Sequence, residues 1–453
     1  MKVVLTVHQF LPDYASGTEI LTFETAKELQ KRGHHVTVFA AYPTRNPVED
    51  AARLDRYVYE GVPVERFHYN RVPMGTQSNL VEMEYDNHLV ESYFKAYIKS
   101  ERPDVVHFFH LLHLSASPIA ACHELHVPMV LTPTDFWFIC PLVELRWPDN
   151  RTCPGPDNYA SNCIRHMFAV SRSARANSLF QRIPTRLIKL VVLLITRFGD
   201  LDGKLSPYVR ALAARRKFLQ HRINLIDRVL APTRLMSSKL SENGLETRRI
   251  VALPFGLNLS YMQGVRRPTP GASLRLGFIG TLKDHKGVHV LVQALRELSG
   301  KPIELKIYGK TTETNRYVRK LKAMAAEDPR IEFCGTFPNS RIGEVFSQLD
   351  ALVVPSLWHE NSPLVIYSAQ AAGCPVIASD MAGMSEVIMH GDNGLLFRAG
   401  NVHELAACIN SLLEKPDLLQ QLSTNARRPL SIEEYADKLV HVYTELHAEA
   451  AGR

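Results

Sequence analysis

The chain has 453 residues, of which 45% are hydrophobic and 22% charged, and its formal net charge is +7. That length exceeds one ordinary core and predicts at least two domains, and the composition is that of a folded protein, not of a disordered or fibrous one. Seven cysteines, an odd number, favour free thiols in a reducing cytoplasm over a disulfide framework.

The opening residues and the apolar runs carry no signal for export or for crossing a membrane. Residues 1–12 are typical of a strand and lack the apolar core of a signal peptide. The longest apolar run, residues 190–195, is far shorter than the roughly 20 residues that a spanning helix needs. We therefore expect a cytoplasmic protein without a membrane span.

Strands and helices alternate along the first half of the chain. We expect strands at 2–9, 34–42, 104–110 and 127–135, a hairpin at 55–69 with Gly61 at its turn, and helices at 19–33 and 80–103. A basic segment then interrupts the pattern, and strands resume at about 223–233 and 248–256.

The alternation restarts after a stretch rich in Pro and Gly at 264–273, which is the predicted linker. Strands are expected at 274–280, 303–309, 331–337, 351–356 and 375–379, with helices between them. The pattern predicts an N-terminal domain at 1–262, with a basic insertion at about 165–222, and a C-terminal domain at 274–430. Residues 431–453 form a helix that we expect to return to the first domain.

Repeated strand–helix units predict an α/β fold with two Rossmann-like domains, whose ligand binds in the cleft between them, at the carboxyl ends of the strands. Neither half has the G-x-G-x-x-G of a dehydrogenase after a strand, and the G-x-x-x-x-G-K-[ST] of a P-loop NTPase is also absent. Both of those enzyme classes are therefore excluded.

The stretch "GFIGTLKDHKG" has the composition of an anion-binding loop. Gly280 allows a tight turn after the strand, and Lys286 lies where the next helix opens. A lysine beside free helix N–H groups can hold a diphosphate. The alternative is a solvated lysine near a turn, since surface lysines are common.

A second stretch, "WHENSPLV", repeats this arrangement at another strand end. We expect a helix with Ser362 as N-cap, Pro363 at its first position and Gly373 at its end. Glu360 lies just before the N-terminus of this helix. A carboxylate there could accept hydrogen bonds from sugar hydroxyls while the helix N–H groups bind phosphate. A nucleotide sugar offers both groups. The alternative is a carboxylate that complements the helix dipole.

These residues carry a family resemblance. Residues 349–397, "GFIGTLKDHKG", "LIDRVLAPTRLMSSKLSENG" and "LPDYASGTEILTFETAKELQKRGHHVTVF" together resemble the retaining glycosyltransferases of the GT-B fold, family 4, also called glycosyl transferases group 1. The likeness covers nearly the whole chain. It implies a nucleotide-sugar donor domain in the C-terminal half and an acceptor domain in the N-terminal half.

The resemblance also assigns roles to individual residues. It implies that Glu360 holds sugar hydroxyls, that Lys286 neutralises the diphosphate, and that Gly17 lets the backbone approach the donor phosphate. The implied donor-binding residues are Gly17, Gly280, Thr281, Lys286, Glu360, Asn361, Ser362, Pro363, Leu364, Val365 and Ser368. No cofactor is implied besides the donor substrate.

Three positions depart from the family pattern. A second glutamate usually follows the first by eight residues, and here that position is Ser368. The arginine that often follows the loop glycine is Thr281, and the histidine before the aspartate of an "HD" turn is Thr134, ahead of Asp135. Ser368 can donate one hydrogen bond to a ribose but cannot form a carboxylate clamp.

The family implies retention at the anomeric carbon without a metal ion. The diphosphate would leave as the acceptor hydroxyl attacks from the same face, with Lys286 and the helix N-terminus stabilising the leaving charge. The catalytic residues are then Glu360 and Lys286, with Asp135, His110 and also His107 as candidate bases. The alternative to a catalytic role is, for each histidine, a structural role in packing or hydrogen bonding.

One segment carries the basic character of the chain. Residues 165–222 contain thirteen lysines and arginines against two aspartates, which leaves the rest of the chain near −4. Within it, residues 179–201 place basic side chains around an apolar helix, a pattern of helices that lie on anionic membranes. We expect residues 179–222 to contact the inner face of a membrane. A helix buried against the domain is the alternative, and the pattern does not favour nucleic acid.

Cys140, Cys153, Cys163 and His166 form a possible zinc-ligand set, although paired C-x-x-C spacing is absent. Free thiols are the expectation, and no metal is assigned.

We interpret the chain as a peripheral membrane glycosyltransferase that moves a sugar from a nucleotide diphosphate to a glycan or polyprenyl-linked acceptor in cell-surface polysaccharide or glycolipid synthesis. Two alternatives stay open. One is a GT-B nucleotide-sugar epimerase, which needs no acceptor. The other is a weakly active or inactive scaffold, which Ser368, Thr281 and Thr134 would suit.

Overall fold

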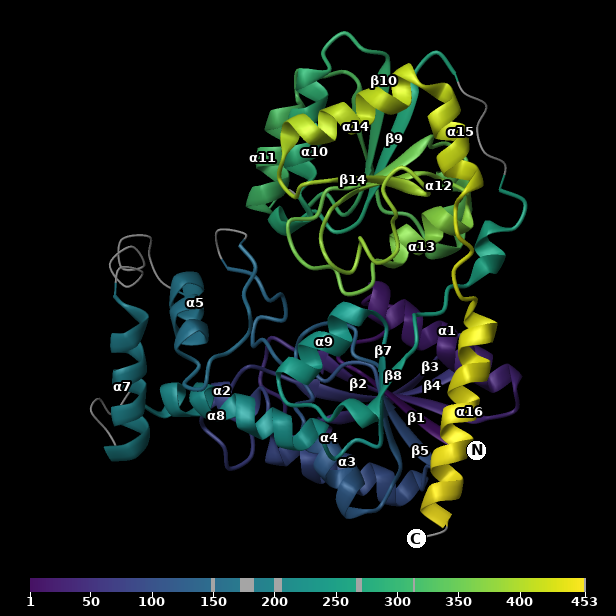
Figure 1. Cartoon of the computed structure of the whole chain (residues 1–453). Coiled ribbons are helices and arrows are strands. Elements are labelled where there is room, and N and C mark those ends of the chain that lie inside the picture. Colours follow the sequence, from purple (N-terminus) through teal and green to yellow (C-terminus); the bar gives the residue numbers. More distant parts are fainter. Residues whose placement is uncertain (148–150, 172–182, 199–205, 266–270, 313, 452–453) are drawn as a thin grey trace. The chain divides into compact units, whose positions relative to one another are not determined.

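The structure, a computed structural model, describes residues 1–147, 151–171, 183–198, 206–265, 271–312 and 314–451 (Figure 1). It divides into unit 1, Met1–Pro254 with Glu433–Arg453, and unit 2, Phe255–Ile432. Unit 2 begins at Phe255, before the linker predicted at 264–273. Leu257 already hydrogen-bonds Leu430 and Ile432 at 3.0 and 2.8 Å. Part of that linker, 266–270, lies outside the described residues.

Unit 1 is built on an eight-stranded sheet in the order β3-β4-β2-β1-β5-β6-β7-β8. All neighbouring strands are parallel except β3 and β4, which form the predicted hairpin. The strands are β1 (Lys2–Val7), β2 (His35–Pro43), β3 (Leu54–Tyr59), β4 (Val62–Tyr69), β5 (Val105–Phe108), β6 (Met129–Leu131), β7 (Arg228–Ala231) and β8 (Ile250–Ala252).

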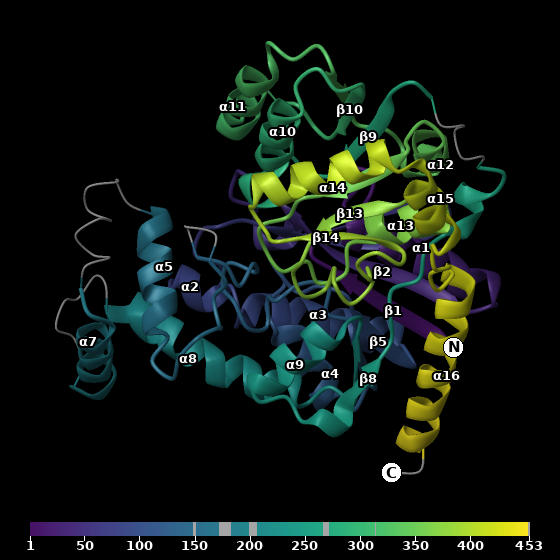
Figure 2. The same cartoon turned by 45° about the horizontal axis from the view of Figure 1, so that its top comes forward.

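Helices cover this sheet, and the last helix of the chain belongs to unit 1 (Figures 1 and 2). The α-helices are α1 (Gly17–Lys31), α2 (Leu80–Met83), α3 (His88–Glu101), α4 (Ser117–Glu124), α5 (Ser161–Ser171), α7 (Thr185–Phe198), α8 (Ser206–Ile223), α9 (Arg234–Glu242) and α16 (Ile432–Ala451). Short 3-10 turns are η1 (Asp50–Ala52) and η2 (Thr247–Arg249). Tyr435 and Tyr443 of α16 are fully buried.

The single helix predicted at 80–103 is wrong, because the structure has two helices there. Asn79 and Asn87 each cap a helix, and Asn87 accepts hydrogen bonds from the N–H groups of Leu89 and Val90 at 3.1 Å. An Asn side chain that binds the N–H groups ahead of it starts a new helix instead of continuing the old one.

Unit 2 is built on a fully parallel six-stranded sheet in the order β11-β10-β9-β12-β13-β14. Numbered within the unit, this is the order 3-2-1-4-5-6 of a doubly wound sheet. The strands are β9 (Leu274–Ile279), β10 (Ile303–Tyr308), β11 (Ile331–Gly335), β12 (Ala351–Val354), β13 (Val376–Ser379) and β14 (Gly394–Phe397).

Side chains on the two faces of the unit 2 sheet enter two separate cores. On β12, Ala351 and Val353 join one core and Leu352 and Val354 the other, as the alternation of a strand requires. The helices that cover these faces are α10 (Val288–Glu297), α11 (Arg316–Ala325), α12 (Ile342–Phe346), α13 (Leu364–Ala371), α14 (Val402–Glu414) and α15 (Pro416–Thr424), with the 3-10 turns η3 (Leu259–Met262), η4 (Asp284–Lys286) and η5 (Asn339–Arg341).

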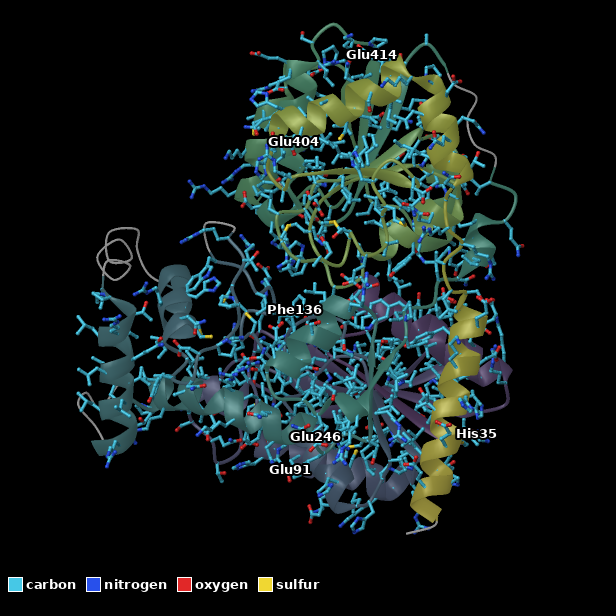
Figure 3. The ribbon with its side chains drawn as sticks, in the orientation of Figure 1. His35, Glu91, Phe136, Glu246, Glu404 and Glu414 are labelled. Carbon is cyan, nitrogen blue, oxygen red and sulfur yellow. The ribbon has the colours of Figure 1, made fainter. Side chains whose placement is uncertain are left out.

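Side chains fill the interior of both units (Figure 3), and Phe136, labelled there in unit 1, is 1% exposed. The predicted fold class, α/β with two Rossmann-like domains, is confirmed. In each sheet the first strand lies between strands whose connections run in opposite directions, β9 between β10 and β12, and β1 between β2 and β5. Ligands of open α/β sheets bind at such switch points, outside the carboxyl ends of the strands.

Candidate functional site

The loop after β9 is pressed against the end of β12 in unit 2. The N–H of Leu357 donates to the carbonyl of His285 at 2.7 Å. Gly287 has φ +71°, and a Cβ at this position would lie 1.8 Å from the carbonyl oxygen of Pro355. Only glycine fits such a contact and such a φ. The close approach carries Lys286 to the loop that follows β12.

Glu360, in that second loop, receives three hydrogen bonds on one oxygen. Its Oε1 accepts from Lys286 Nζ at 2.6 Å, from Ser356 Oγ at 2.7 Å and from Trp358 Nε1 at 2.8 Å. Glu360 is 7% exposed, so these bonds lie away from solvent. The two residues singled out for the donor chemistry, Lys286 and Glu360, are thus in direct contact at the switch point of the unit 2 sheet.

The charge of Glu360 is stabilised in spite of its burial. Burial by itself raises the pKa of a carboxyl group. Here the Lys286 ammonium and the hydrogen bonds from Lys286, Ser356 and Trp358 outweigh that effect, and the pKa of Glu360 lies below its usual value of 4.5. The site therefore holds a carboxylate and an ammonium side by side at neutral pH.

Helix α13 begins one residue later than the sequence indicated. Pro363 is the N-cap, with ψ 101°, and Leu364 is the first helical residue, so the assignment of Ser362 as N-cap is wrong. Pro363 takes the extended conformation of a cap, whereas Ser362 Oγ turns to the Tyr367 hydroxyl at 3.3 Å. The amides of Leu364 and Val365 still belong to the first turn, whose N–H groups point out of the helix.

The other residues of the predicted donor set are placed as follows. Gly280 follows β9, and its N–H donates to the carbonyl of Tyr308 at 3.0 Å. Thr281 is exposed, whereas Asn361 is 5% exposed beside Glu360 in the chain. Ser368 is 2% exposed and donates to the Leu364 carbonyl of its own helix at 3.0 Å. Gly17 is the exposed first residue of α1, in unit 1.

Sequence reasoning missed two residues that hold Glu360. Ser356 and Trp358 precede it in the same loop, and the Trp358 ring also lies 5.0 Å from Lys286 Nζ and 4.9 Å from the ring of His285. A cation against an indole face is attractive. The "PSLWHE" stretch offered a signal, since residues four and two before Glu360 in one loop can fold back onto its side chain.

The sheet of unit 1 brings His110 and Asp135 together, both predicted as candidate bases. His110 follows β5, and its Nε2 lies 2.5 Å from Asp135 Oδ2. The N–H of Leu112 donates to His110 Nδ1 at 3.0 Å, so Nε2 carries the proton that Asp135 accepts. The N–H of Trp137 fixes the other Asp135 oxygen at 2.8 Å.

His8 lies against this pair, with Glu19 and His113 close to His8, and all three were missed from the sequence. His8 follows β1, and its ring lies 4.2 Å from that of His110. Its Nε2 is 3.4 Å from Glu19 Oε1, and its Nδ1 is buried without a hydrogen-bond partner in the described structure. Burial, with His110 and His113 nearby, holds the pKa of His8 well below its usual 6.5. Histidines at the ends of adjacent strands were the available signal.

His107 is not available as a base. It is fully buried, with Nδ1 2.6 Å from the Tyr443 hydroxyl of α16 and Nε2 2.8 Å from Thr132 Oγ1. Burial lowers the pKa of His107 to about 3. Nδ1 therefore ties the sheet to α16, Nε2 ties β5 to Thr132 after β6, and the catalytic assignment is replaced by the structural one.

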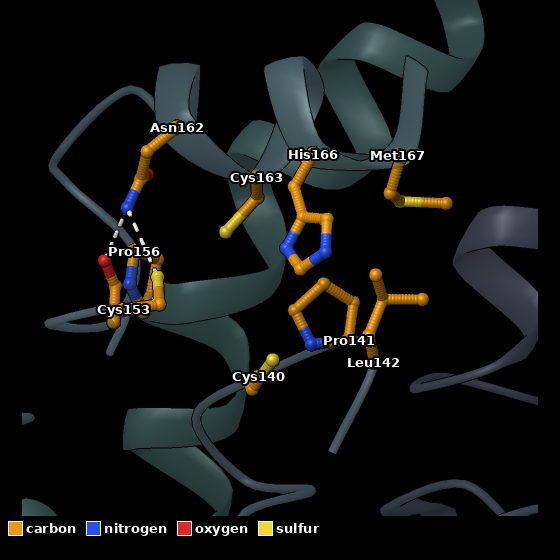
Figure 4. Close-up of a pocket in the computed structure, with 10 residues that line it drawn as sticks. Cys140, Pro141, Leu142, Cys153, Pro156, Asn162, Cys163, His166 and Met167 are labelled. Atoms are coloured by element: carbon orange, nitrogen blue, oxygen red, sulfur yellow. Dashed lines mark hydrogen bonds between the residues drawn. The ribbon is translucent and has the colours of Figure 1, made fainter. Parts of the chain in front are cut away.

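Cys140, Cys153, Cys163 and His166 line one small pocket of about 10 Å³, roughly the room for one water molecule (Figure 4). All seven cysteines are free thiols. Burial raises the pKa of Cys140, Cys153 and Cys163, which keeps the thiols protonated. Among the described residues no group of three or more His, Cys, Asp or Glu is arranged to hold a metal ion.

Two family models match the chain. Glycosyltransferase Family 4 matches residues 15–192, and glycosyl transferases group 1 matches residues 267–429, which contains the Lys286–Glu360 pair. Among curated proteins, D-inositol 3-phosphate glycosyltransferase of Nocardia farcinica is 30% identical over 44% of this chain and 48% of its own length. Spore coat protein SA of Bacillus subtilis is 30% identical over 37% and 47%. The chain thus spans about half the length of these relatives.

Solved structures of the same architecture extend over the whole chain. Sucrose-phosphate synthase of Thermosynechococcus elongatus has a TM-score of 0.68 at 17% identity and covers 99% of both chains. Anabaena HepE, in complex with UDP and glucose, has a TM-score of 0.63 at 15% identity, with coverage of 98% and 99%. At such identities the likeness concerns the fold.

Proposed function

This chain belongs to the glycosyl transferases group 1 with the GT-B fold, and from that premise we propose that it moves a sugar from a nucleotide-diphosphate sugar to an acceptor hydroxyl. The observation that carries the proposal is the contact between Lys286 and Glu360 at the switch point of unit 2. A cation for the diphosphate and a carboxylate for the sugar then occupy one site.

The donor would bind across this pair. The Lys286 ammonium has three N–H donors and spends one on Glu360 Oε1, so it can hold phosphate oxygens without releasing the carboxylate. The first-turn amides at Leu364 and Val365 offer further donors to phosphate. The hydrogen bonds from Lys286, Ser356 and Trp358 all reach Oε1 of Glu360, and we propose that Oε2 accepts the sugar hydroxyls.

We propose transfer with retention at the anomeric carbon. The bond from that carbon to the diphosphate breaks as the acceptor oxygen approaches the same face, and the charge that develops on the leaving phosphate is stabilised by Lys286 and the α13 amides. The acceptor proton passes to the leaving phosphate or to a base of unit 1. His110 and Asp135 are the proposed acceptor-side pair at the switch point of their own sheet, with Asp135 as the proton acceptor because both ring nitrogens of His110 are already engaged.

The wider role follows from the acceptor. We propose a glycan or polyprenyl-linked acceptor in cell-surface polysaccharide or glycolipid synthesis, taken by unit 1 at the inner face of a membrane. The basic segment of unit 1 supports this acceptor class, because lipid-linked substrates are reached from an anionic surface. No helix among the described residues is long and apolar enough to cross a membrane.

One observation favours the scaffold alternative. Ser368 occupies the position of the family's second glutamate, and its hydroxyl is committed to the Leu364 carbonyl inside α13. A ribose would then lack its carboxylate clamp, and donor affinity would fall. A chain that binds no nucleotide and retains its fold would be a binding-only member of an assembly.

A thermal-shift panel of UDP, GDP, ADP, TDP and CMP with their common sugars tests the donor site. UDP and UDP-glucose come first, because HepE has been solved with UDP-glucose. At about 100 times Kd a ligand adds roughly 2.7 kcal/mol of stability. We expect one nucleotide to stabilise the wild type and Lys283→Ala but not Lys286→Ala, since Lys283 is an exposed lysine of the same loop.

The sugar conjugate of that nucleotide should raise the unfolding temperature further, and Glu360→Ala should remove this additional thermal shift. Trp358 gives an independent readout, because it is the sole tryptophan of residues 255–432 and donates directly to Glu360. Equal loss in the Lys283 and Lys286 variants would contradict the assignment of the diphosphate to Lys286. Absence of any shift at millimolar nucleotide would favour the scaffold.

A further inference from the structure

Helix α7 (Thr185–Phe198) is apolar on two separate sides. Ile188, Val192 and Ile195 are 6%, 2% and 8% exposed and form the side that packs on the unit. Leu187, Leu190 and Val191 are 52%, 50% and 49% exposed. Their spacing of three and four residues places them on one face, away from the packed side.

In the described part of the chain, exposed large hydrophobic side chains are concentrated on α7. Four of the exposed large hydrophobic side chains, Leu187, Leu190, Val191 and Leu193, lie on α7. The others are scattered over separate elements, namely Val58, Tyr208, Val251 and Met389. Single exposed hydrophobics are ordinary, whereas a contiguous patch marks an interaction surface.

Basic side chains border the patch. Arg186, Leu190 and Arg197 are four and seven residues apart, which puts both exposed arginines on the side of the helix where Leu190 lies. The helix contains no acidic residue. An apolar stripe edged by arginines is complementary to a bilayer with anionic headgroups, whose acyl region takes the aliphatic side chains and whose phosphates take the arginines.

Three arginines of α8 (Ser206–Ile223) serve the fold. Arg215 is 5% exposed, and its guanidinium donates to the carbonyls of Trp137 and Ile139. Arg210 donates to the Ile195 carbonyl at 3.2 Å, and Arg216 to Asn158 at 3.0 Å. Within the segment expected to contact a membrane, 179–222, the exposed face of α7 is therefore the candidate surface. Residues 179–182 and 199–205 of that segment lie outside the described residues.

A second copy of the chain matches this face less well. An antiparallel pair of α7 helices with a two-fold axis near Val191 would set Arg186 of one copy against Arg197 of the other. Like charges placed opposite each other disfavour such a pairing.

We propose that the exposed face of α7 is a docking surface for an anionic lipid bilayer. The helix has 14 residues and is about 21 Å long, shorter than the roughly 30 Å hydrocarbon core, so it lies in the plane of the interface. Leu187, Leu190 and Val191 enter the acyl boundary, and Arg186 and Arg197 stay at the headgroups. The inference rests on the proposed function for its purpose, access to lipid-linked acceptors, but lipid binding needs no sugar transfer.

Co-sedimentation of the full chain with vesicles tests the surface. The probes are phosphatidylcholine vesicles with and without about 30% phosphatidylglycerol. We expect the wild type to bind the anionic vesicles, and Leu187→Gln/Leu190→Gln/Val191→Gln to bind at least tenfold more weakly. The matched control, Val58→Gln/Val251→Gln/Met389→Gln, replaces three exposed hydrophobics elsewhere and should bind like the wild type.

The arginines give a separate signature. Each basic residue near an anionic surface is worth about fivefold in affinity, so Arg186→Gln/Arg197→Gln should lose roughly 25-fold on anionic vesicles and little on neutral ones. Equal loss in the two triple variants, or no binding by the wild type, would overturn the proposal. So would a dimer in sedimentation velocity that the α7 triple variant dissociates. Nucleotide-induced thermal shifts of these variants separate failure of the membrane surface from failure of the donor site.

Discussion

Glu360 directs one carboxylate oxygen at three donors from two loops, and the donor chemistry proposed for unit 2 rests on this arrangement. A carboxylate that is 7% exposed stays charged only if its partners offset the loss of water. Lys286, Ser356 and Trp358 do so. The pair is therefore a prearranged charge site whose energetics can be measured without any ligand.

Glu360→Gln should destabilise unit 2 by about 2 to 3 kcal/mol near neutral pH, because it leaves the Lys286 ammonium without its counter-charge. The pKa of Glu360 is lowered in the folded state, so its contribution is present above the usual value of 4.5 and is lost as the pH falls through the lower folded value. The difference in unfolding free energy between the variant and the wild type should become smaller in acid. Urea unfolding followed by Trp358 fluorescence at about pH 7 and about pH 3.5 measures it; a constant gap would contradict the carboxylate assignment.

His107 predicts a pH dependence of unit 1. Its folded pKa is about 3 against 6.5 for a free histidine, so between these values the unfolded chain binds a proton that the folded chain does not. Stability should fall with decreasing pH by about 1.4 kcal/mol per unit from this residue. His107→Gln should make the slope of unfolding free energy against pH shallower over about pH 6 to 4.

At the scale of elements, the proposed donor site depends on how closely two loops approach. The loop after β9 and the loop after β12 meet where Gly287 faces the Pro355 carbonyl, and Gly383 approaches the Glu360 carbonyl from a third loop in the same way. A Cβ at Gly383 would lie 1.7 Å from that oxygen. The backbone is thus packed so tightly around Glu360 that side chains are excluded at two positions.

Gly287→Ala should displace the Lys286 loop. The matched control is Gly300→Ala, whose φ of +74° equals that of Gly287 within a few degrees but which has nothing within 4 Å of the added Cβ. The control should lose about 1 kcal/mol through backbone strain alone. Gly287→Ala should lose clearly more and should also weaken nucleotide binding, as thermal unfolding with and without nucleotide would measure. Similar losses in both variants would show that the contact with Pro355 does not matter.

At the scale of the whole molecule, the last helix completes the first unit of the chain. Helix α16 (Ile432–Ala451) buries Tyr435 and Tyr443 in unit 1, and its Asp437 binds Arg32, the residue that follows α1, at 2.7 Å. The sequence-distant end of the chain therefore contributes core residues to the sheet that also carries His110 and Asp135. Unit 2 keeps its own two cores.

Tyr443→Ala should lower the stability of unit 1 by about 3 to 5 kcal/mol, because it leaves a cavity and removes a hydrogen bond to buried His107. Nucleotide binding should persist, since the Lys286–Glu360 pair lies in unit 2. Calorimetry with nucleotide should show a lowered transition for unit 1 and an unchanged ligand-induced shift for unit 2. Loss of nucleotide binding in a folded variant would place unit 1 in the donor site.

The sequence by itself determined the architecture and singled out the main charged residues of the proposed donor site. Alternating strand and helix periodicities are local, so both sheets, the hairpin at Gly61 and the α16 helix could be predicted from short windows. Lys286 and Glu360 could be chosen because each follows a strand and stands near a helix start, and strand ends of a parallel sheet share one edge.

Tertiary structure alone decided which of these groups touch. That Ser356 and Trp358 join Lys286 on one oxygen of Glu360, and that Ser368 turns to the Leu364 carbonyl, depends on side-chain directions that no spacing fixes. His107 and His110 lie three residues apart, yet one is locked between Thr132 and Tyr443 and the other faces Asp135. Successive side chains of a strand point to opposite faces, and what covers each face comes from residues far along the chain.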